Sequence, residues 1–280
     1  MKLAAVRNKR QIPERVTAAD VVQDLQRSTG YFEENSFLRL GDADSAHGVL
    51  FGNFHDKELV AVKPFRKQAR AEREADNLHR IQRLGFTALE PKQVIVGDLR
   101  TYLITDYRKD IRHMGQMSWN ASIASPNLKD IITPAVEQAS RTLAAWHSAQ
   151  LYNGDAQVKN LAFDRQGESV YIDAERAQFN PPAGEDMIMG SKDLEMFGLT
   201  ALARGLLADR SASFRAGYLN EHLLDPYFDV VRLNPTITEP AGRAKAITNH
   251  WVGAIDHGHA PIWALPQLET TQSVSVVQRM

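Results

Sequence analysis

The sequence contains no cysteine. This absence excludes a disulfide framework, a zinc site built from thiolates and a cysteine nucleophile, and it fits a reducing compartment. Long apolar runs are missing as well, because no segment reaches the ~18 consecutive apolar residues of a membrane-spanning helix. Near the start of the chain, Lys2 and Arg7 interrupt any apolar core of a signal peptide. We therefore expect a cytoplasmic protein without a membrane span.

An excess of charge of one sign is also missing. The 33 lysine and arginine residues stand against 34 aspartate and glutamate residues, which leaves a formal net charge of -1. Without a basic field, we expect no nucleic-acid partner and no attraction to an anionic membrane. The 280 residues are 43% hydrophobic, which is enough for the core of one large domain or of two lobes.

The first half of the chain alternates between helical and strand-like patterns. Thr17 and Asp20 resemble a capping box at the start of a short helix that ends before Gly30. The following apolar runs predict a lobe with a five-stranded antiparallel sheet and one helix. We expect the strands at residues 37–40, 49–52, 58–65, 94–96 and 101–107, and the helix at residues 70–84.

The loop between the first two predicted strands is bracketed by Gly41 and Gly48. Glycines allow backbone N–H groups to approach phosphates, so this loop is a candidate cover for a nucleotide. The loop also carries Asp42 and Asp44, whose charges would repel phosphate. An ordinary polar hairpin loop is therefore the alternative interpretation.

Lys63 follows alternating apolar residues in the third predicted strand. The predicted helix after it places Glu74 one turn before the apolar Leu78, from where Glu74 would pair with Lys63. Glu72 is the alternative partner, and the helical phase favours Glu74. A lysine exposed at the end of a strand is the common alternative role of such a residue.

Three oxygen-bearing side chains lie around a predicted hairpin in the second half of the chain. Asp155 and Asn160 precede the strand-like residues 161–163, and Asp173 follows the strand-like residues 170–172. This spacing would place the three side chains at the mouth of one hairpin. Carboxylate and amide oxygens there can hold magnesium and orient a hydroxyl against a nucleoside triphosphate. A helix that starts at Thr133 and Pro134 is expected to lead into this stretch.

These motifs resemble the protein kinase-like superfamily, in its atypical branch of aminoglycoside phosphotransferases, lipopolysaccharide-core sugar kinases and small atypical protein kinases. The catalytic loop of the superfamily has an asparagine five residues after its aspartate, as Asp155 and Asn160 have here. Its metal-binding aspartate ends the second following strand, as Asp173 does. Val60-Ala61-Val62-Lys63 is similar to its lysine-bearing strand, and Gly154 matches the His-Gly-Asp form of the loop.

The resemblance implies an α+β, two-lobed kinase-like fold. It divides the chain into an N-terminal extension with a short helix (1–30), an N-lobe with an antiparallel sheet and one helix (31–106), a mainly helical C-lobe (107–265) and a flexible tail (266–280).

The resemblance also implies ATP and Mg²⁺ as cofactors and a hydroxyl as the phosphate acceptor. Lys63, held by Glu74, would bind the α and β phosphates, while Asn160 and Asp173 hold magnesium. Asp155 would orient and deprotonate the acceptor hydroxyl. The adenine ring would hydrogen-bond to the backbone of a hinge at Thr105, Asp106 and Tyr107.

The chain departs from the pattern of the superfamily at two positions. Asn153 stands in place of the histidine, and Glu175 lies in the pair that replaces Phe-Gly after Asp173. Glu175 is either a further carboxylate beside the metal or a residue that packs and bridges an arginine. Asp193 resembles the aspartate that supports the catalytic loop, with a helix N-cap as the alternative. The short interval between Asp173 and Asp193 has no room for a long activation loop.

The acceptor stays open between a small molecule and a protein serine or threonine. A catalytically weak pseudokinase that binds nucleotide or a partner is one alternative function, supported by Asn153, Glu175 and the acidic loop. Transfer of the nucleotidyl group is another. We interpret His250, His257 and His259 as surface or core residues, since their spacing matches no recognised set of metal ligands.

Overall fold

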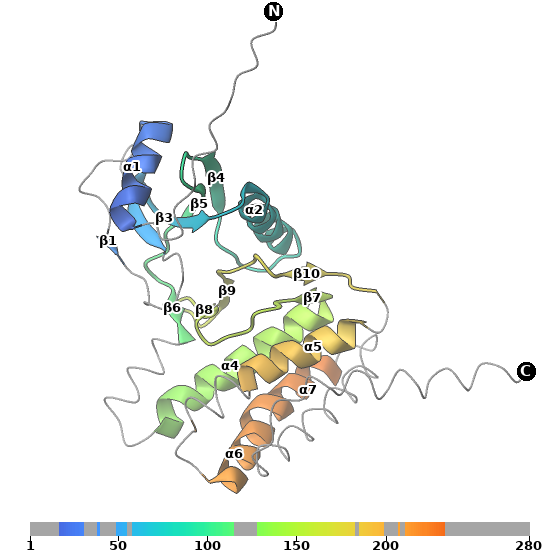
Figure 1. Ribbon diagram of the computed structural model, residues 1–280. Coiled ribbons are helices and arrows are strands. Elements are labelled where there is room, and N and C mark those ends of the chain that lie inside the picture. The colour runs from blue at the N-terminus through green and yellow to red at the C-terminus, as the bar shows by residue number, and fades with distance from the viewer. Residues whose placement is uncertain are drawn as a thin grey trace, which may run out of the picture. The chain divides into compact units, whose positions relative to one another are not determined.

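The computed structural model describes residues 17–30, 38–39, 49–54, 58–114, 128–182, 185–198, 207 and 211–232. The chain divides into two compact units (Figure 1). The first unit comprises Met1–Arg80 with Ala88–Lys109, and the second comprises Ile81–Thr87 with Asp110–Met280. Among the described residues, no helix has the length and apolar character needed to cross a membrane.

The first unit is built on the antiparallel sheet that the alternating patterns predict. Its strand order is β1-β2-β3-β5-β4, and all neighbouring strands are antiparallel. The helix predicted between the third and fourth strands is also present. The strands are β1 (Leu38–Arg39), β2 (Leu50–Phe54), β3 (Glu58–Phe65), β4 (Pro91–Val96) and β5 (Thr101–Asp106), and the helices are α1 (Ala18–Thr29) and α2 (Gln68–Arg83).

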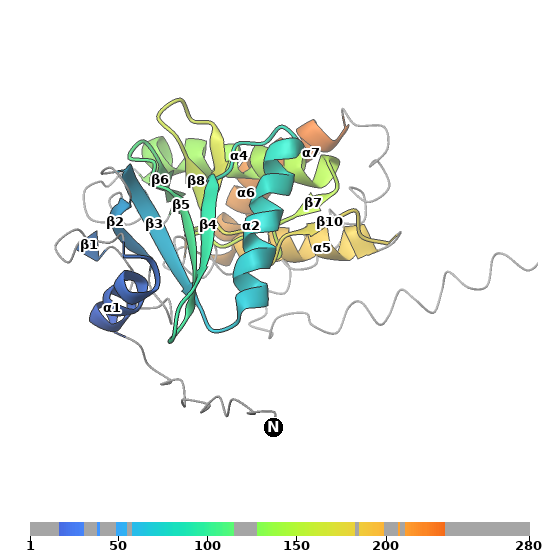
Figure 2. The same cartoon turned by 90° about the horizontal axis from the view of Figure 1, so that it is seen from above.

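Helices α1 and α2 lie on opposite sides of the sheet (Figure 2). Successive side chains of a strand point to opposite faces. Accordingly, Val60 and Val62 of β3 are fully buried in the cluster that includes α1, whereas Lys63 pairs with Glu74 of α2. The sheet therefore has an apolar face under α1 and presents Lys63 on the other face.

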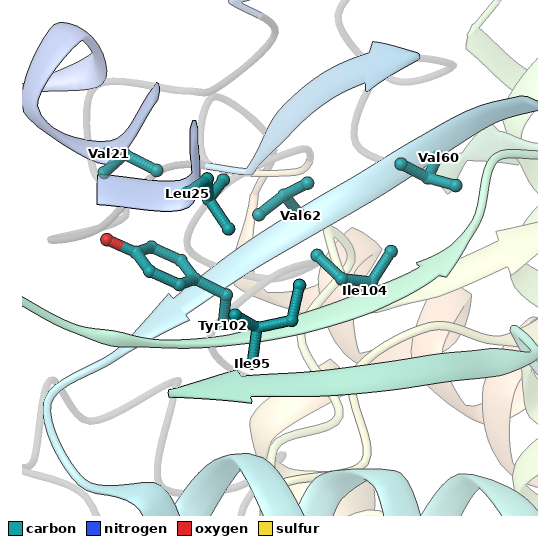
Figure 3. Packing of buried hydrophobic residues seen from close by; sticks show 7 residues of the cluster. All are labelled: Val21, Leu25, Val60, Val62, Ile95, Tyr102 and Ile104. Carbon is teal, nitrogen blue, oxygen red and sulfur yellow. The ribbon is translucent and has the colours of Figure 1, made fainter. Parts of the chain in front are cut away.

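Helix α1 is part of the first unit's core, whereas the sequence suggested only an extension before the lobe. Its capping box between Thr17 and Asp20 and its left-handed C-cap at Gly30 confirm the predicted ends. Val21 and Leu25 are buried, and Figure 3 shows them packed over the sheet. The strand residues of this cluster are Val60, Val62, Ile95, Tyr102 and Ile104.

A buried carboxylate also joins α1 to the turn between β4 and β5. Asp24 is 1% exposed and accepts backbone hydrogen bonds from Asp98 (2.8 Å), Leu99 (2.9 Å) and Arg100 (3.2 Å). It accepts a fourth from the Tyr102 hydroxyl at 2.6 Å. Burial is the main reason why the pKa of Tyr102 is raised, with the bond to Asp24 as the second cause, so this hydroxyl remains a donor. Asp24 therefore orders a turn far from it in the sequence.

Replacing Asp24 by alanine is expected to destabilise the first unit by roughly 3 kcal/mol or more, since four donors lose their shared acceptor. Tyr102→Phe removes one donor and is expected to cost about 1 kcal/mol. The exposed Asp76→Ala is the control, with a change within about 0.5 kcal/mol. All four tryptophans belong to the second unit, so tryptophan fluorescence would not report on the first. Hydrogen exchange of the β5 amides is therefore the measurement. Unchanged β5 protection in Asp24→Ala would contradict this role.

The second unit contains a helical layer and two small sheets. Figure 1 shows α4, α5 and α7 side by side. One sheet has the order β6-β8-β9, and β7 pairs with β10. The helices are α4 (Leu128–Ser148), α5 (Glu185–Glu195), α6 (Ala212–Leu219), the π-helical turn η2 (Asn220–Leu224) and α7 (Asp225–Arg232), and the strands are β6 (Arg112–His113), β7 (Leu151–Tyr152), β8 (Leu161–Phe163), β9 (Ser169–Tyr171) and β10 (Gln178–Phe179).

The predicted start of helix α4 is wrong. The helix begins at Leu128, and Pro134 lies inside it. Proline removes one intrahelical hydrogen bond, which usually restricts it to the first turn. Here Ile132 and Val136 are both buried on either side of Pro134, so packing of the helix outweighs the lost bond. The loop with Gly41 and Gly48, the three late histidines and the predicted tail lie outside the described residues.

Candidate functional site

The first unit holds a lysine–glutamate pair in which the lysine is partly buried and the glutamate fully buried. Lys63 Nζ donates to both carboxylate oxygens of Glu74, at 2.8 and 3.0 Å, and Glu74 is 1% exposed. Glu72 instead accepts from Gln68 on the exposed side of α2. The structure thus confirms the pairing with Glu74 that the helical phase favoured. A two-point contact of this kind holds the ammonium group of Lys63 in a defined place.

Of the predicted hinge residues, Thr105 and Asp106 end strand β5 and Tyr107 follows it. Thr105 is buried and lies opposite Ala61 of β3. Asp106 is tied to Glu90, because its N–H donates to the Glu90 carbonyl (2.9 Å) and its carboxylate accepts from the Glu90 N–H (2.5 Å). Burial raises the pKa of Asp106. The ring of Tyr107 lies edge-on to Phe51 of β2, with centroids 4.8 Å apart. The backbone N–H and the carboxylate of Asp106 are therefore engaged within the unit.

In the second unit, hydrogen bonds hold Asp155 on several sides. Its N–H donates to Asn153 Oδ1 (3.0 Å), and its carbonyl accepts from Asn160 Nδ2 (2.9 Å). One carboxylate oxygen, Oδ1, accepts from Gln157 Nε2 at 2.7 Å. The loop from Asn153 to Asn160 is therefore a compact turn that fixes Asp155 and Asn160 relative to each other.

The β8–β9 hairpin brings Asn160 and Asp173 to the same end. Leu161 pairs with Tyr171, so Asn160 directly precedes one strand at the end where Asp173 follows the other. The Asn160 Nδ2 atom is used by the Asp155 carbonyl, which leaves Oδ1 as the amide atom able to bind a cation. Together with the Asp173 carboxylate it supplies the oxygen ligands that magnesium prefers. These residues fit a magnesium site.

Glu175 lies close to Asp173 along the chain. Its backbone N–H donates to Asp173 Oδ1 at 3.5 Å, and its side chain is partly buried. The described contact is made by the backbone of Glu175. At 3.5 Å this contact is weak, and it leaves both interpretations of the Glu175 side chain open.

Gly154 has a backbone that favours glycine. Its φ is +72°, in the left-handed region, and a Cβ atom would lie 2.5 Å from the carbonyl oxygen of Arg176. Any other residue would therefore be strained and would also collide with the backbone. This explains in physical terms why glycine precedes Asp155.

Asp193 supports the loop from Asn153 to Asn160 through hydrogen bonds to its first two residues, as the resemblance implied. Its carboxylate accepts from the backbone N–H groups of Asn153 (2.6 Å) and Gly154 (2.8 Å), and it is 1% exposed. The alternative of a helix N-cap is wrong, because Asp193 lies in the last turn of α5. The carboxylate holds the two residues that precede Asp155, so α5 determines where the loop begins.

Two further residues of this support were not recognised in the sequence. His147 of α4 contacts Asp193 through Nε2 (3.2 Å) and the Tyr227 hydroxyl of α7 through Nδ1 (2.8 Å). A carboxylate only accepts, so Nε2 carries the proton. Burial strongly raises the pKa of Tyr227, so its hydroxyl keeps its proton. The available signal was a histidine on the same helical face as the buried Leu143 and Ala144.

Asn153 is a buried residue of the loop that holds Asp155. The residue is 1% exposed, and its Oδ1 accepts from the N–H of Asp155. Its backbone N–H donates to Asp193. Its Nδ2 is buried and has no hydrogen-bond partner among the described residues. Asn153 therefore supports the loop through its amide oxygen and its backbone N–H.

Comparisons with known proteins agree with this architecture at the level of the fold. No family model matches the sequence, and no curated protein matches it. The solved structure of WaaP in complex with acyl carrier protein matches with a TM-score of 0.53 at 15% sequence identity. The match covers 82% of this chain and 92% of that chain. At this identity the likeness concerns the fold, and it shows a mixed α and β, kinase-like fold with an antiparallel sheet.

Proposed function

We propose that this protein is an ATP-dependent phosphotransferase that transfers the γ phosphate to a hydroxyl group. The observation that carries the proposal is the loop at Asp155. Asn153 and Asn160 hold the backbone of Asp155, and Asp193 holds the start of the loop. The Asp155 carboxylate and the Asn160 Oδ1 atom are the groups proposed for the chemistry. Phosphoryl transfer requires positioning and charge stabilisation more than covalent help from the protein.

Lys63 supplies the positive charge for the α and β phosphates in this proposal. The buried Glu74 holds the ammonium group by two hydrogen bonds. A lysine held in this way does not need to be ordered when the nucleotide binds. The backbone around Thr105, Asp106 and Tyr107 and the loop between Gly41 and Gly48 are proposed as further nucleotide contacts.

Asn160 and Asp173 are the proposed magnesium ligands. When bound, magnesium neutralises charge on the phosphate oxygens. Asn160 offers Oδ1 and Asp173 its carboxylate.

Asp155 is the proposed base. It accepts the proton of the acceptor hydroxyl as the hydroxyl oxygen forms a bond to the γ phosphorus and the bond between that phosphorus and the bridging oxygen breaks. The products are ADP, the phosphorylated acceptor and a proton, which Asp155 releases to solvent.

The acceptor is a small molecule or a protein serine or threonine. Two alternatives keep the nucleotide but change the outcome. A pseudokinase would bind ATP without turnover. Asn153 argues less for this alternative than the sequence suggested, because the asparagine holds the loop by accepting from the Asp155 N–H. A nucleotidyl transferase would transfer the nucleotidyl group, which contains the α phosphate, in place of the γ phosphate.

Labelled ATP decides among these functions. With magnesium, we expect ATP to raise the melting temperature of the protein and to release or transfer its γ label, while the α label stays on ADP. Transfer of the α label would instead indicate a nucleotidyl transferase. A thermal shift without release or transfer of either label, across a panel of sugar, aminoglycoside and protein acceptors, would indicate a pseudokinase.

A further inference from the structure

Gln157 makes two contacts with Asp155, which lies two residues before it. Its side-chain Nε2 donates to Asp155 Oδ1 at 2.7 Å, and its backbone N–H donates to the Asp155 carbonyl, also at 2.7 Å. Both side chains are partly buried, so water competes less with the contact than at an exposed site. Gln157 therefore holds both the main chain and the carboxylate of the same residue.

The contact makes the two carboxylate oxygens of Asp155 unequal. Oδ1 accepts from Gln157. In the part of the chain that the structure describes, no hydrogen-bond donor contacts Oδ2. An oxygen that is to receive a proton from an acceptor hydroxyl must have a lone pair available. Each carboxylate oxygen has two lone pairs. Gln157 engages one of those on Oδ1, whereas no described donor engages Oδ2, so Oδ2 is the more available acceptor.

We propose that Gln157 is a positioning residue, which fixes the Asp155 carboxylate so that Oδ2 receives the proton of the acceptor hydroxyl. This inference rests on the proposed function. The N–H of Asp155 is already held by Asn153 and its carbonyl by Asn160. The side-chain torsions of Asp155 are the freedom that remains, and the bond from Gln157 restricts them.

The chemistry of an amide suits this role. The Gln157 side chain provides a directed N–H donor without a net charge. It can therefore orient the carboxylate without neutralising it. Because a displacement of about 1 Å from the reactive geometry can cost about 100-fold in rate, the effect of losing this bond should appear in turnover.

The test compares Gln157→Met with Gln166→Met. Methionine has nearly the shape of glutamine but no N–H donor, and Gln166 is exposed in the β8–β9 turn. With Mg·ATP and water as the acceptor, we expect Gln157→Met to lower kcat for γ-phosphate release by about 10- to 100-fold. The KM for ATP should stay within about twofold of wild type, because the proposed nucleotide contacts are elsewhere. The melting temperature should stay within a few degrees of wild type. Gln166→Met should behave as wild type.

A second measurement detects the contact without turnover. The side-chain amide resonance of Gln157 is identified in NMR spectra by its loss in Gln157→Met. We expect this resonance to move upfield in Asp155→Ala, since the donated proton loses its carboxylate, and to stay in place in Asp76→Ala. No movement in Asp155→Ala would overturn the contact.

The outcomes separate this inference from the proposed function. Two results with an active wild type would show that the positioning role is wrong while the proposed function stands. In one, Gln157→Met keeps kcat within twofold of wild type. In the other, its kcat falls while the KM for ATP rises and the melting temperature drops. If the wild type releases no γ phosphate with any acceptor, the proposed function fails and the role of Gln157 in turnover fails with it. The NMR measurement then still decides whether the amide holds the carboxylate.

Discussion

Replacing either Asp155 or Asp173 by alanine is expected to abolish phosphoryl transfer while the fold stays intact. Asp155 is the proposed base, and such a group contributes roughly 100- to 10,000-fold to a rate. Asp173 is the proposed magnesium ligand, without which charge on the phosphates is not neutralised. We therefore expect a loss of at least about 100-fold in each variant.

The two variants should differ in nucleotide binding. Asp155→Ala keeps Lys63, Asn160 and Asp173, so ATP with magnesium should still raise its melting temperature as in the wild type. Asp173→Ala should lose most of the magnesium-dependent part of that increase. The exposed Asp76→Ala is the matched control for both the label assay and the melting curve. Turnover close to wild type in either Asp155→Ala or Asp173→Ala would contradict the mechanism.

The second large effect is expected in Asp193→Ala. This change leaves the N–H groups of Asn153 and Gly154 and the Nε2–H of His147 without their acceptor in a buried place. Orphaned buried donors of this kind cost about 1 to 3 kcal/mol each when nothing replaces the partner, and the costs overlap. We expect a destabilisation of the second unit by roughly 3 to 5 kcal/mol.

Tryptophan fluorescence is the suitable measurement, because all four tryptophans belong to the second unit and Trp146 is buried beside His147 in α4. Unfolding in urea should shift to lower concentration in Asp193→Ala. Tyr227→Phe removes one hydroxyl from the same network and should cost only about 1 kcal/mol. Lys192→Ala, one residue earlier and exposed, should unfold like the wild type. An unchanged urea midpoint of unfolding in Asp193→Ala would mean that the carboxylate does not stabilise the loop.

The loss of activity in Asp193→Ala should exceed what unfolding explains. Under conditions where the variant is still folded, the N–H groups that precede Asp155 are no longer held in place, so the position of the base becomes variable. We expect a lower kcat with a smaller change in the KM for ATP. This pattern would distinguish support of the catalytic loop from general stability.

The sequence by itself determined the elements that depend on neighbouring residues. The capping box at Thr17 and Asp20 and the bounds of β3 follow from local backbone and side-chain chemistry. The choice of Glu74 over Glu72 follows from the helical phase, because only one of the two side chains lies on the buried face of α2. The position of Asp155 five residues before Asn160 is likewise a local spacing, and it indicated the site.

Only the tertiary structure decided which distant residues complete these local elements. Asp24 receives its donors from the β4–β5 turn, and Asp193 receives one of its donors from His147, which in turn contacts Tyr227 on another helix. A single sequence carries no signal for such contacts, since the residues are far apart and each has a common alternative role on a helix surface. Packing likewise extended α4 through Pro134, where local preference predicted a start. The physical reason is that burial and hydrogen bonding between elements exceed the local preferences of about 1 kcal/mol that sequence patterns express.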